Sequence, residues 1–232
     1  NAGADAYNVA VGYDAGRNVT TGINNTIVGG LAGDAITTGS QNVALGYNSL
    51  GSDTIGNSNV AIGHLALTTN VAADRNVAIG VQALYTMTAA STADTYNTAV
   101  GFNAGLAVTD GTDNTLIGGL AGASLTTGNQ NIALGRSALS AGIGAGDNVA
   151  IGYAAMSANT TGNANVAIGT QALNGANNSG TSTYNIGIGY NAGLVTSTGT
   201  KNILIGGFAG DAITTANYNI AIGHNALSTE DT

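Results

Sequence analysis

Asn59-Val60-Ala61-Ile62-Gly63 is one of thirteen copies of a five-residue motif that recurs along the whole chain. Each copy begins with Asn, ends with Gly, and has Val, Ile or Leu as its fourth residue. Successive copies start 17 residues apart, except for one step of 21 residues and one of 20. We number each repeat from its Asn, which is position 1. The thirteen asparagines are Asn8, Asn25, Asn42, Asn59, Asn76, Asn97, Asn114, Asn131, Asn148, Asn165, Asn185, Asn202 and Asn219.

A 17-residue unit is too short to fold alone, so it must stack on its neighbours. The β-branched residues at position 2 favour a strand, and no 3.6-residue period runs through the unit. Many units carry Thr-Thr-Gly near positions 13 to 15, which is typical of a tight turn. The sequence therefore predicts an all-β fold, a parallel β-solenoid of about thirteen 17-residue coils.

The coils are expected to form a single continuous array over residues 1–232. Residues 4–8 match residues 93–97 closely, so we interpret the chain as a fragment of a longer fibre that begins near a recurring junction. Position 9 is Gly in two successive coils and then Leu or Met in three. This pattern divides the array into five-coil blocks, approximately 4–92, 93–180 and 181–232.

The repeated Asn and Gly are interpreted as structural. Identical amides stacked at strand spacing can form hydrogen bonds from coil to coil, and Asn also tolerates the bend of a corner. The Gly at position 5 suits a positive φ or the close approach of another backbone. A catalytic Asn would not be repeated thirteen times, so we predict a structural ladder of asparagines.

The residue at position 3 raises the question of assembly. In a strand, positions 2 and 4 point to one face and position 3 to the other. If positions 2 and 4 fill the core, position 3 points outward, yet it is Ala, Gly or a larger aliphatic residue in every copy. This pattern predicts a strand that is covered on both faces, and hence a side-by-side oligomer with position 3 at the contact.

A second expectation concerns volume. In the second coil of each block, position 3 is enlarged and position 6 is reduced to Gly. Such an exchange indicates that the two positions share one packed space. The enlarged residues are Ile27, Leu116 and Leu204, and the glycines are Gly30, Gly119 and Gly207.

Composition excludes several classes of function. Four basic residues against twelve acidic ones give a net charge of −8, which argues against binding nucleic acid through its phosphates. No apolar run reaches the length of about 18 residues that a membrane helix needs, so no membrane insertion by this segment is expected. Cysteine is absent, which excludes disulfides and cysteine nucleophiles.

Catalytic and metal-binding patterns are weak. His64 and His224 are the only histidines, and both are expected on the surface. Gly29–Asp34 and Gly206–Asp211 are similar to calcium-binding β-roll repeats, but the necessary columns of Asp are lacking. No Ser/His/Asp or paired-carboxylate arrangement is suggested by spacing. We therefore expect no enzymatic activity, no metal and no cofactor.

Tyrosines recur at two places in the repeat, position 6 and the residue before the Asn. Amphipathic rings in columns are candidate contacts for a glycan or protein receptor, and the alternative is that they cap the corners of the core. The two inserted loops, residues 85–96 and 174–184, are further candidates because loops vary without disturbing the coils. The candidates are Tyr13, Tyr47, Tyr153 and Tyr190 at position 6, Tyr7, Tyr96, Tyr184 and Tyr218 before the Asn, and Tyr85 in the first insertion.

The motif Asn-Val-Ala-Ile-Gly, present at Asn59, Asn76, Asn148 and Asn165, resembles the head repeats of trimeric autotransporter adhesins of the YadA-like type. The run at 97–105, followed by a Thr-Gly turn, is similar to repeats of bacteriophage tail fibres. The resemblance implies a homotrimer of left-handed parallel β-rolls that attaches to a surface. The coil here is longer than the usual adhesin unit and lacks its Ser after the Asn, so bacterial adhesin and phage fibre both stay open.

These observations predict a non-enzymatic extracellular fibre or adhesin head segment, on a bacterial cell surface or a virion, that mediates attachment through a surface glycan or protein receptor. One alternative is a purely structural fibre shaft or filament subunit. Another is an ice-binding solenoid, because position 13 is Thr in many coils. Val71, Ile143 and Asn177 interrupt that column, and adjacent threonines in a strand would point to opposite faces.

Overall fold

A computed structural model describes residues 6–88, 94–176 and 182–229. The chain divides into two compact units, Asn1–Asp113 and Asn114–Thr232, and each is described by itself. Unit 1 contains β1 (Val9–Val11), β2 (Thr26–Val28), β3 (Val43–Leu45), β4 (Val60–Ile62), β5 (Val77–Ile79) and β6 (Thr98–Val100). Unit 2 contains β7 (Thr115–Ile117), β8 (Ile132–Leu134), β9 (Val149–Ile151), β10 (Val166–Ile168), β11 (Ile186–Ile188), β12 (Ile203–Ile205) and β13 (Ile220–Ile222).

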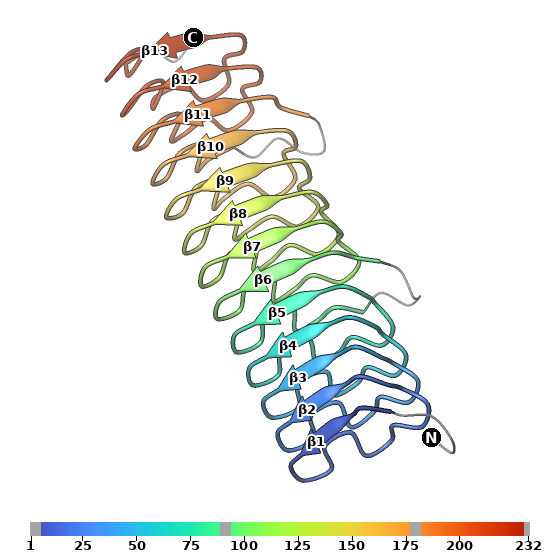
Figure 1. Cartoon of the computed structure of the whole chain (residues 1–232). Helices are drawn as coiled ribbons and strands as arrows, with labels where there is room; N and C mark the ends of the chain where they lie inside the picture. The colour runs from blue at the N-terminus through green and yellow to red at the C-terminus, as the bar shows by residue number, and fades with distance from the viewer. Residues whose placement is uncertain (1–5, 89–93, 177–181, 230–232) are drawn as a thin grey trace. The chain divides into compact units, whose positions relative to one another are not determined.

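Each strand covers positions 2 to 4 of one repeat, and within each unit the strands pair in parallel in chain order (Figure 1). Equal positions face one another, as in the pairing of Val60 with Val77. The register survives both longer steps, since Val77 pairs with Thr98 and Val166 with Ile186. The prediction of an all-β parallel β-solenoid is confirmed. The expected block boundaries, 92/93 and 180/181, lie within residues 89–93 and 177–181, which are outside the described residues.

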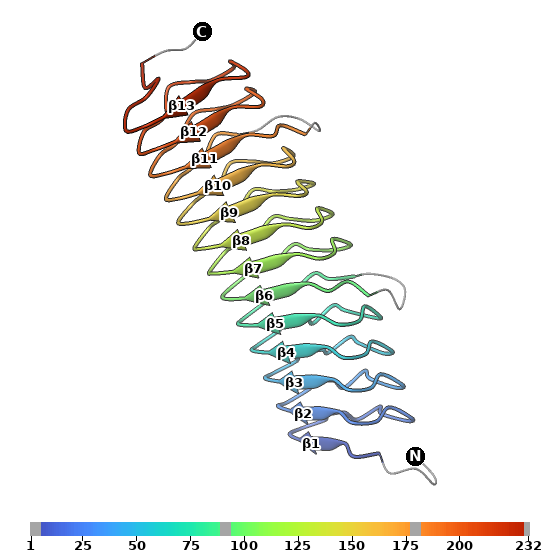
Figure 2. The same cartoon turned by 45° about the horizontal axis from the view of Figure 1, so that its top comes forward.

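Figure 2 shows that each strand forms one side of a coil and that turns make up the rest. The described residues contain no helix, and therefore none with the length and apolarity needed to cross a membrane.

The expected assignment of the strand faces is wrong. Position 3 points into the core, where Ala61 and Ala150 are fully buried, and positions 2 and 4 lie outside. Small residues fit at position 3 because the interior of the coil is narrow and long side chains enter it from the opposite wall. Leu67 and Met156, at position 9 of the same coils, are fully buried.

Core volume is exchanged between positions 3 and 9, so the expected exchange between positions 3 and 6 is also wrong. A Cβ at Gly122, position 9, would lie 2.8 Å from Leu116 Cδ2, and a Cβ at Gly210 would lie 2.6 Å from Leu204 Cδ2. The larger residue at position 3 therefore occupies the space that Leu or Met fills in other coils. By contrast, a Cβ at Gly30, position 6, would meet only Tyr47, at an ordinary 3.6 Å.

Every coil turns through backbone in the left-handed region. Non-glycine residues with positive φ occur at positions 7 and 9 and before the Asn, and they include Leu50, Leu67 and Met156 at φ of 50° to 52°. Such a conformation costs on the order of 1 kcal/mol or more for a residue with a Cβ. Burial of these long side chains in the core offsets that cost.

The Gly at position 5 has both features that its repetition suggested. Gly46 and Gly63 have φ of 131° and 135°. A Cβ at Gly46 would lie 2.6 Å from the carbonyl oxygen of Gly63, so only glycine allows the coils to approach this closely.

The repeated asparagines from Asn25 to Asn202 are buried, and they make two kinds of hydrogen bond. Asn148 Nδ2 donates to the carbonyl of Gly162 at 2.8 Å, which closes its own coil. The backbone N–H of Asn165 donates to Asn148 Oδ1 at 3.0 Å, which joins the next coil. The same pair of bonds recurs at Asn25, Asn42 and Asn59 in unit 1. These four amides thus set both the corner of their own coil and the spacing to the next one.

A threonine joins the ladder after each longer step. Thr95 Oγ1 donates to Asn76 Oδ1 at 2.8 Å, and Thr183 Oγ1 donates to Asn165 Oδ1. The backbone N–H of Asn97 still reaches Asn76 Oδ1 at 3.1 Å. The ladder is therefore continuous past each insertion within its unit.

Replacing Leu116 by Ala should leave a cavity and lower the free energy of unfolding by about 2 to 5 kcal/mol. Adding Gly122→Leu should restore part of this loss, because Ala133 and Leu139 are both buried in the following coil. Chemical denaturation of the single and double variants measures the coupling. Gly119→Tyr is the matched control at position 6 and should restore nothing; equal rescue by both second changes would contradict the core assignment.

Asn148→Ala should lower the free energy of unfolding by about 2 to 5 kcal/mol, because the buried N–H and Nδ2 of Asn165 both lose Asn148 Oδ1 as their acceptor. The Gly162 carbonyl also loses one of its two donors and keeps Asn159 Nδ2. The control is Asn163→Ala, since Asn163 Oδ1 accepts one bond, from the N–H of Gly146, and the side chain is half-buried. Thermal or denaturant unfolding measures the loss of stability in each variant. Equal losses for the two variants would show that the asparagine ladder contributes no more to stability than a half-buried asparagine outside it.

Candidate interaction surface

The outer faces of the strands form an uncharged apolar surface in each unit. Positions 2 and 4 are Val, Ile, Leu or Thr in every repeat. In unit 2, Ile132 and Leu134 are both 43% exposed, and Ile168 is 37% exposed. In unit 1, Leu45 is 45% exposed. A parallel sheet normally has both faces covered. The exposed apolar face of these strands is therefore a candidate interaction surface.

Position 6 forms a column of side chains just beyond the end of each strand. Tyr47, which is 52% exposed, stacks on His64 with ring centroids 5.6 Å apart. In unit 2, Arg136 lies over the ring of Tyr153, 5.9 Å from its centroid. Phe102 continues this column in unit 1 at 56% exposure.

Aromatic contacts also join coils 11 to 13. Tyr190 packs edge-on against Phe208 at 5.2 Å, and Phe208 packs against His224 at 5.9 Å. Phe208 stands at position 7, so the sequence comparison at position 6 alone did not reveal its role. The sequence does mark Phe208 as different, because position 7 is Leu in the equivalent coils of the other two blocks, at Leu31 and Leu120.

The residues before the Asn form a second column at the other end of the strands. In unit 2, Lys201 Nζ lies 4.9 Å from the ring centroid of Tyr218 and donates to its hydroxyl at 3.1 Å. Tyr184 is 56% exposed in the same column. The two tyrosine columns are therefore separate, with the apolar strand faces between them.

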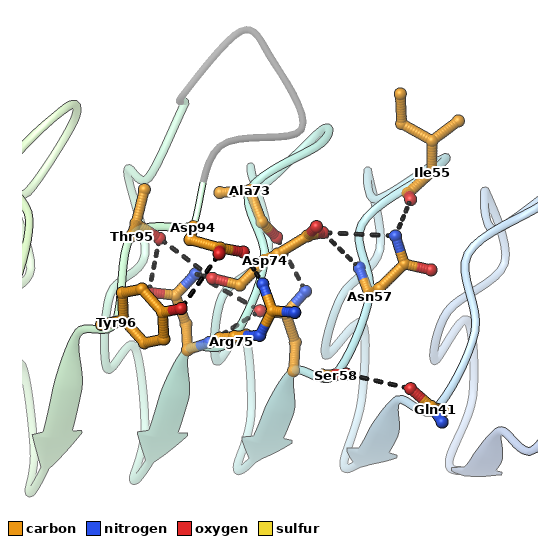
Figure 3. A network of polar contacts seen from close by, with 12 residues as sticks. Gln41, Ile55, Asn57, Ser58, Ala73, Asp74, Arg75, Asp94, Thr95 and Tyr96 are labelled. Atoms are coloured by element: carbon orange, nitrogen blue, oxygen red, sulfur yellow. Dashed lines mark hydrogen bonds and ion pairs between the residues drawn. The ribbon is translucent and has the colours of Figure 1, made fainter.

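Figure 3 shows the corresponding column in unit 1, beside the first insertion. Arg75 pairs with Asp94 and lies over the ring of Tyr96, 5.8 Å from its centroid. The Tyr96 hydroxyl donates to Asp94 Oδ2 at 2.9 Å. Tyr85, at the other end of this insertion, is half-buried. The expected loop contacts at residues 89–93 and 177–181 lie outside the described residues.

A column of threonine hydroxyls follows the turn at position 13. Thr20 Oγ1 donates to the Thr37 carbonyl at 3.0 Å, and Thr37 Oγ1 donates to the Thr54 carbonyl at 2.9 Å. Each of these hydroxyl groups therefore donates its proton to a carbonyl of the next coil. Thr20 and Thr21 are both exposed, because this segment is a bend and strand alternation does not apply to it.

Asp53 is an acidic residue whose side chain lies inside the core. Asp53 is fully buried, and burial raises its pKa to about 7. Hydrogen bonds from the Gly56 N–H and from Asn70 act in the opposite direction, and the nearby charge of Asp74 raises the pKa further. Asp53 was not among the residues predicted to be functional; the signal that could have identified it is that its position is apolar in several other coils.

Within residues 6–88, 94–176 and 182–229, no three His, Asp or Glu side chains lie close enough together to hold a metal ion. His64 and His224 are exposed. In the segment similar to calcium-binding repeats, Asp211 Oδ1 is buried without a hydrogen-bond partner. The surface thus offers repeated apolar, aromatic and hydroxyl groups.

Comparison with known proteins adds no assignment. No family model matches the chain, and no curated protein or solved structure matches it either.

Proposed function

We propose that this chain is a segment of a non-enzymatic extracellular fibre or adhesin head, which assembles as a homotrimer of left-handed solenoids and attaches to a surface. The observation that carries the proposal is the uncharged outer face of the strands. Positions 2 and 4 hold no charged residue in any of the thirteen repeats, and many of these side chains are at least one-third exposed.

The same face supports assembly with copies of this chain. Paired parallel strands repeat every ~4.8 Å, so each unit presents a row of branched apolar side chains at this spacing. A second copy offers the same spacing and the same lack of charge, and therefore matches the row along its whole length. Apolar rows of this kind are covered in a stable protein, because exposed patches above a few hundred Å² are uncommon on monomers.

The aromatic columns support attachment. Rings with an apolar body and a polar tip suit glycan and protein surfaces, and Tyr47, Tyr153 and Tyr190 are each about half exposed. Repetition along the chain and across three copies multiplies weak contacts into avidity. We propose a surface glycan or a protein receptor on a host or target cell as the partner, with a bacterial cell surface or a virion tail fibre as the location of the assembly.

Assembly is tested with Leu134→Asp combined with Ile168→Asp, two outward changes at position 4. Charges placed in an apolar contact cost several kcal/mol, so the oligomer should dissociate while the coils stay folded. Sedimentation and circular dichroism measure the two effects. Thr127→Asp with Thr198→Asp adds the same charge at exposed turn positions and should leave the oligomer intact; a parent protein that sediments as a stable monomer would refute the assembly.

Attachment is tested on a glycan array and on cells with the assembled protein. Tyr153→Ala with Tyr190→Ala should reduce binding at least tenfold, since loss of two repeated contacts is amplified by three copies. Thr127→Ala with Thr198→Ala is the control. An assembled protein that binds no glycan and no cell would favour the alternative, a purely structural fibre shaft or filament subunit.

A further inference from the structure

Asp53 stands at position 12, which is a core position. Large apolar residues fill it in several coils, as Ile36, Met87 and Leu125 do, all of them fully buried. In the third coil, Leu50 takes the space at position 9, and position 12 is the carboxylic acid of Asp53, which is 0% exposed.

The contacts of Asp53 join the third coil to the fourth. The Gly56 N–H donates to Asp53 Oδ1 at 2.7 Å, which forms the corner of the third coil. Asn70, at position 12 of the fourth coil, donates through Nδ2 to Asp53 Oδ2 at 2.6 Å. Asn59 of the ladder approaches the same oxygen at 3.4 Å. The corner and the ladder therefore meet at one buried carboxyl group.

The charges around this group disfavour its ionised form. The charged side chain that acts on it is Asp74, another acid, whose Oδ1 accepts the N–H of Asn57 at 2.6 Å. Arg75 follows Asp74 in the chain but is paired with Asp94 (Figure 3). A carboxylate at Asp53 thus has amide donors but no cation, inside an apolar core.

We propose that Asp53 makes this corner a pH-sensitive element, closed when the carboxyl group is neutral and prone to local opening when it is ionised. The element comprises residues 53–57 of the third coil and residues 70–74 of the fourth. Its opening releases hydrogen bonds on one side of the coils, while the paired strands β3 and β4 hold the other side.

The direction of the pH dependence follows from the carboxyl group. Its pKa in the folded chain is about 7, above the ordinary value of 3.8, so the folded corner binds more protons between these two values. The stability of the corner is therefore fully present below about pH 4, falls as the pH rises toward 7, and becomes constant above about pH 8. A carboxylate that forms ion pairs would show the opposite trend.

The ninth coil contains a natural control. Asn159 occupies position 12 there, is also 0% exposed, and accepts the Gly162 N–H at 2.7 Å. Its geometry matches that of Asp53 with Gly56, but an amide does not titrate. Asn163 lies in the same coil as Asn159, as Asn57 does with Asp53, and it is uncharged.

Amide hydrogen exchange of the full chain between pH 4 and 9, corrected for the intrinsic exchange rate, tests the proposal. The protection of Gly56 should fall by up to about 1,000-fold as the pH rises, because a shift of three pKa units corresponds to that factor, and the protection of Gly162 should stay constant. Parallel protection of the two amides across this range would overturn the proposal. This comparison needs no variant.

Two variants sharpen the result. Asp53→Asn should make the protection of Gly56 independent of pH, and Asp74→Asn should move the midpoint of its loss to lower pH by removing the neighbouring negative charge. The carboxyl carbon of Asp53, followed by NMR, should titrate with a midpoint near neutrality. A midpoint near pH 4 would overturn the proposal even if both variants failed to fold.

Discussion

The hydrogen bond from the backbone of one repeated asparagine to the side-chain oxygen of the preceding one sets the geometry on which each unit depends. The same amide closes its own coil through Nδ2, as Asn148 does with the Gly162 carbonyl. Because both bonds are buried, neither is weakened by competition with water. The spacing they impose brings the glycines at position 5 into backbone contact and keeps equal positions in register.

Within this frame, a coil of 17 residues is filled by very few side chains. One arrangement is Ala at position 3 with Leu or Met at position 9, and a second is a larger residue at position 3 with Gly at position 9. The first coil of each block is small at both positions, and side chains of the neighbouring coils reach its core: a Cβ at Gly193 would lie 2.7 Å from both Leu173 Cδ2 and Leu204 Cδ1. The first arrangement places Leu50, Leu67 and Met156 in left-handed backbone. Position 12 of these three coils holds the polar residues Asp53, Asn70 and Asn159, each of them fully buried.

The sequence was sufficient to predict the solenoid, its coil length and its structural asparagines and glycines, since these follow from a repeat that must stack. It did not reveal which strand face is buried, because positions 2, 3 and 4 are all apolar and alternation gives no direction. The narrow interior of the coil determines which strand face is buried, because it accepts only a small residue at position 3 wherever Leu or Met fills position 9. That narrow shape depends on the positive φ of Leu67 and its equivalents, which the presence of leucine in the sequence does not predict. Tyr47 and Tyr153 were identified as surface candidates by their repetition, whereas Asp53 and Phe208 break the pattern of their columns and were overlooked for that reason.

Every coil presents the same donor toward the coil before it and the same acceptor toward the coil after it, and the two insertions leave this arrangement unchanged. Coils are therefore interchangeable modules. A gene that encodes near-identical neighbouring repeats can lose or duplicate a whole repeat by unequal recombination, and the resulting protein would still place each asparagine against the next. The number of coils can then change over generations independently of the residues that any one coil displays.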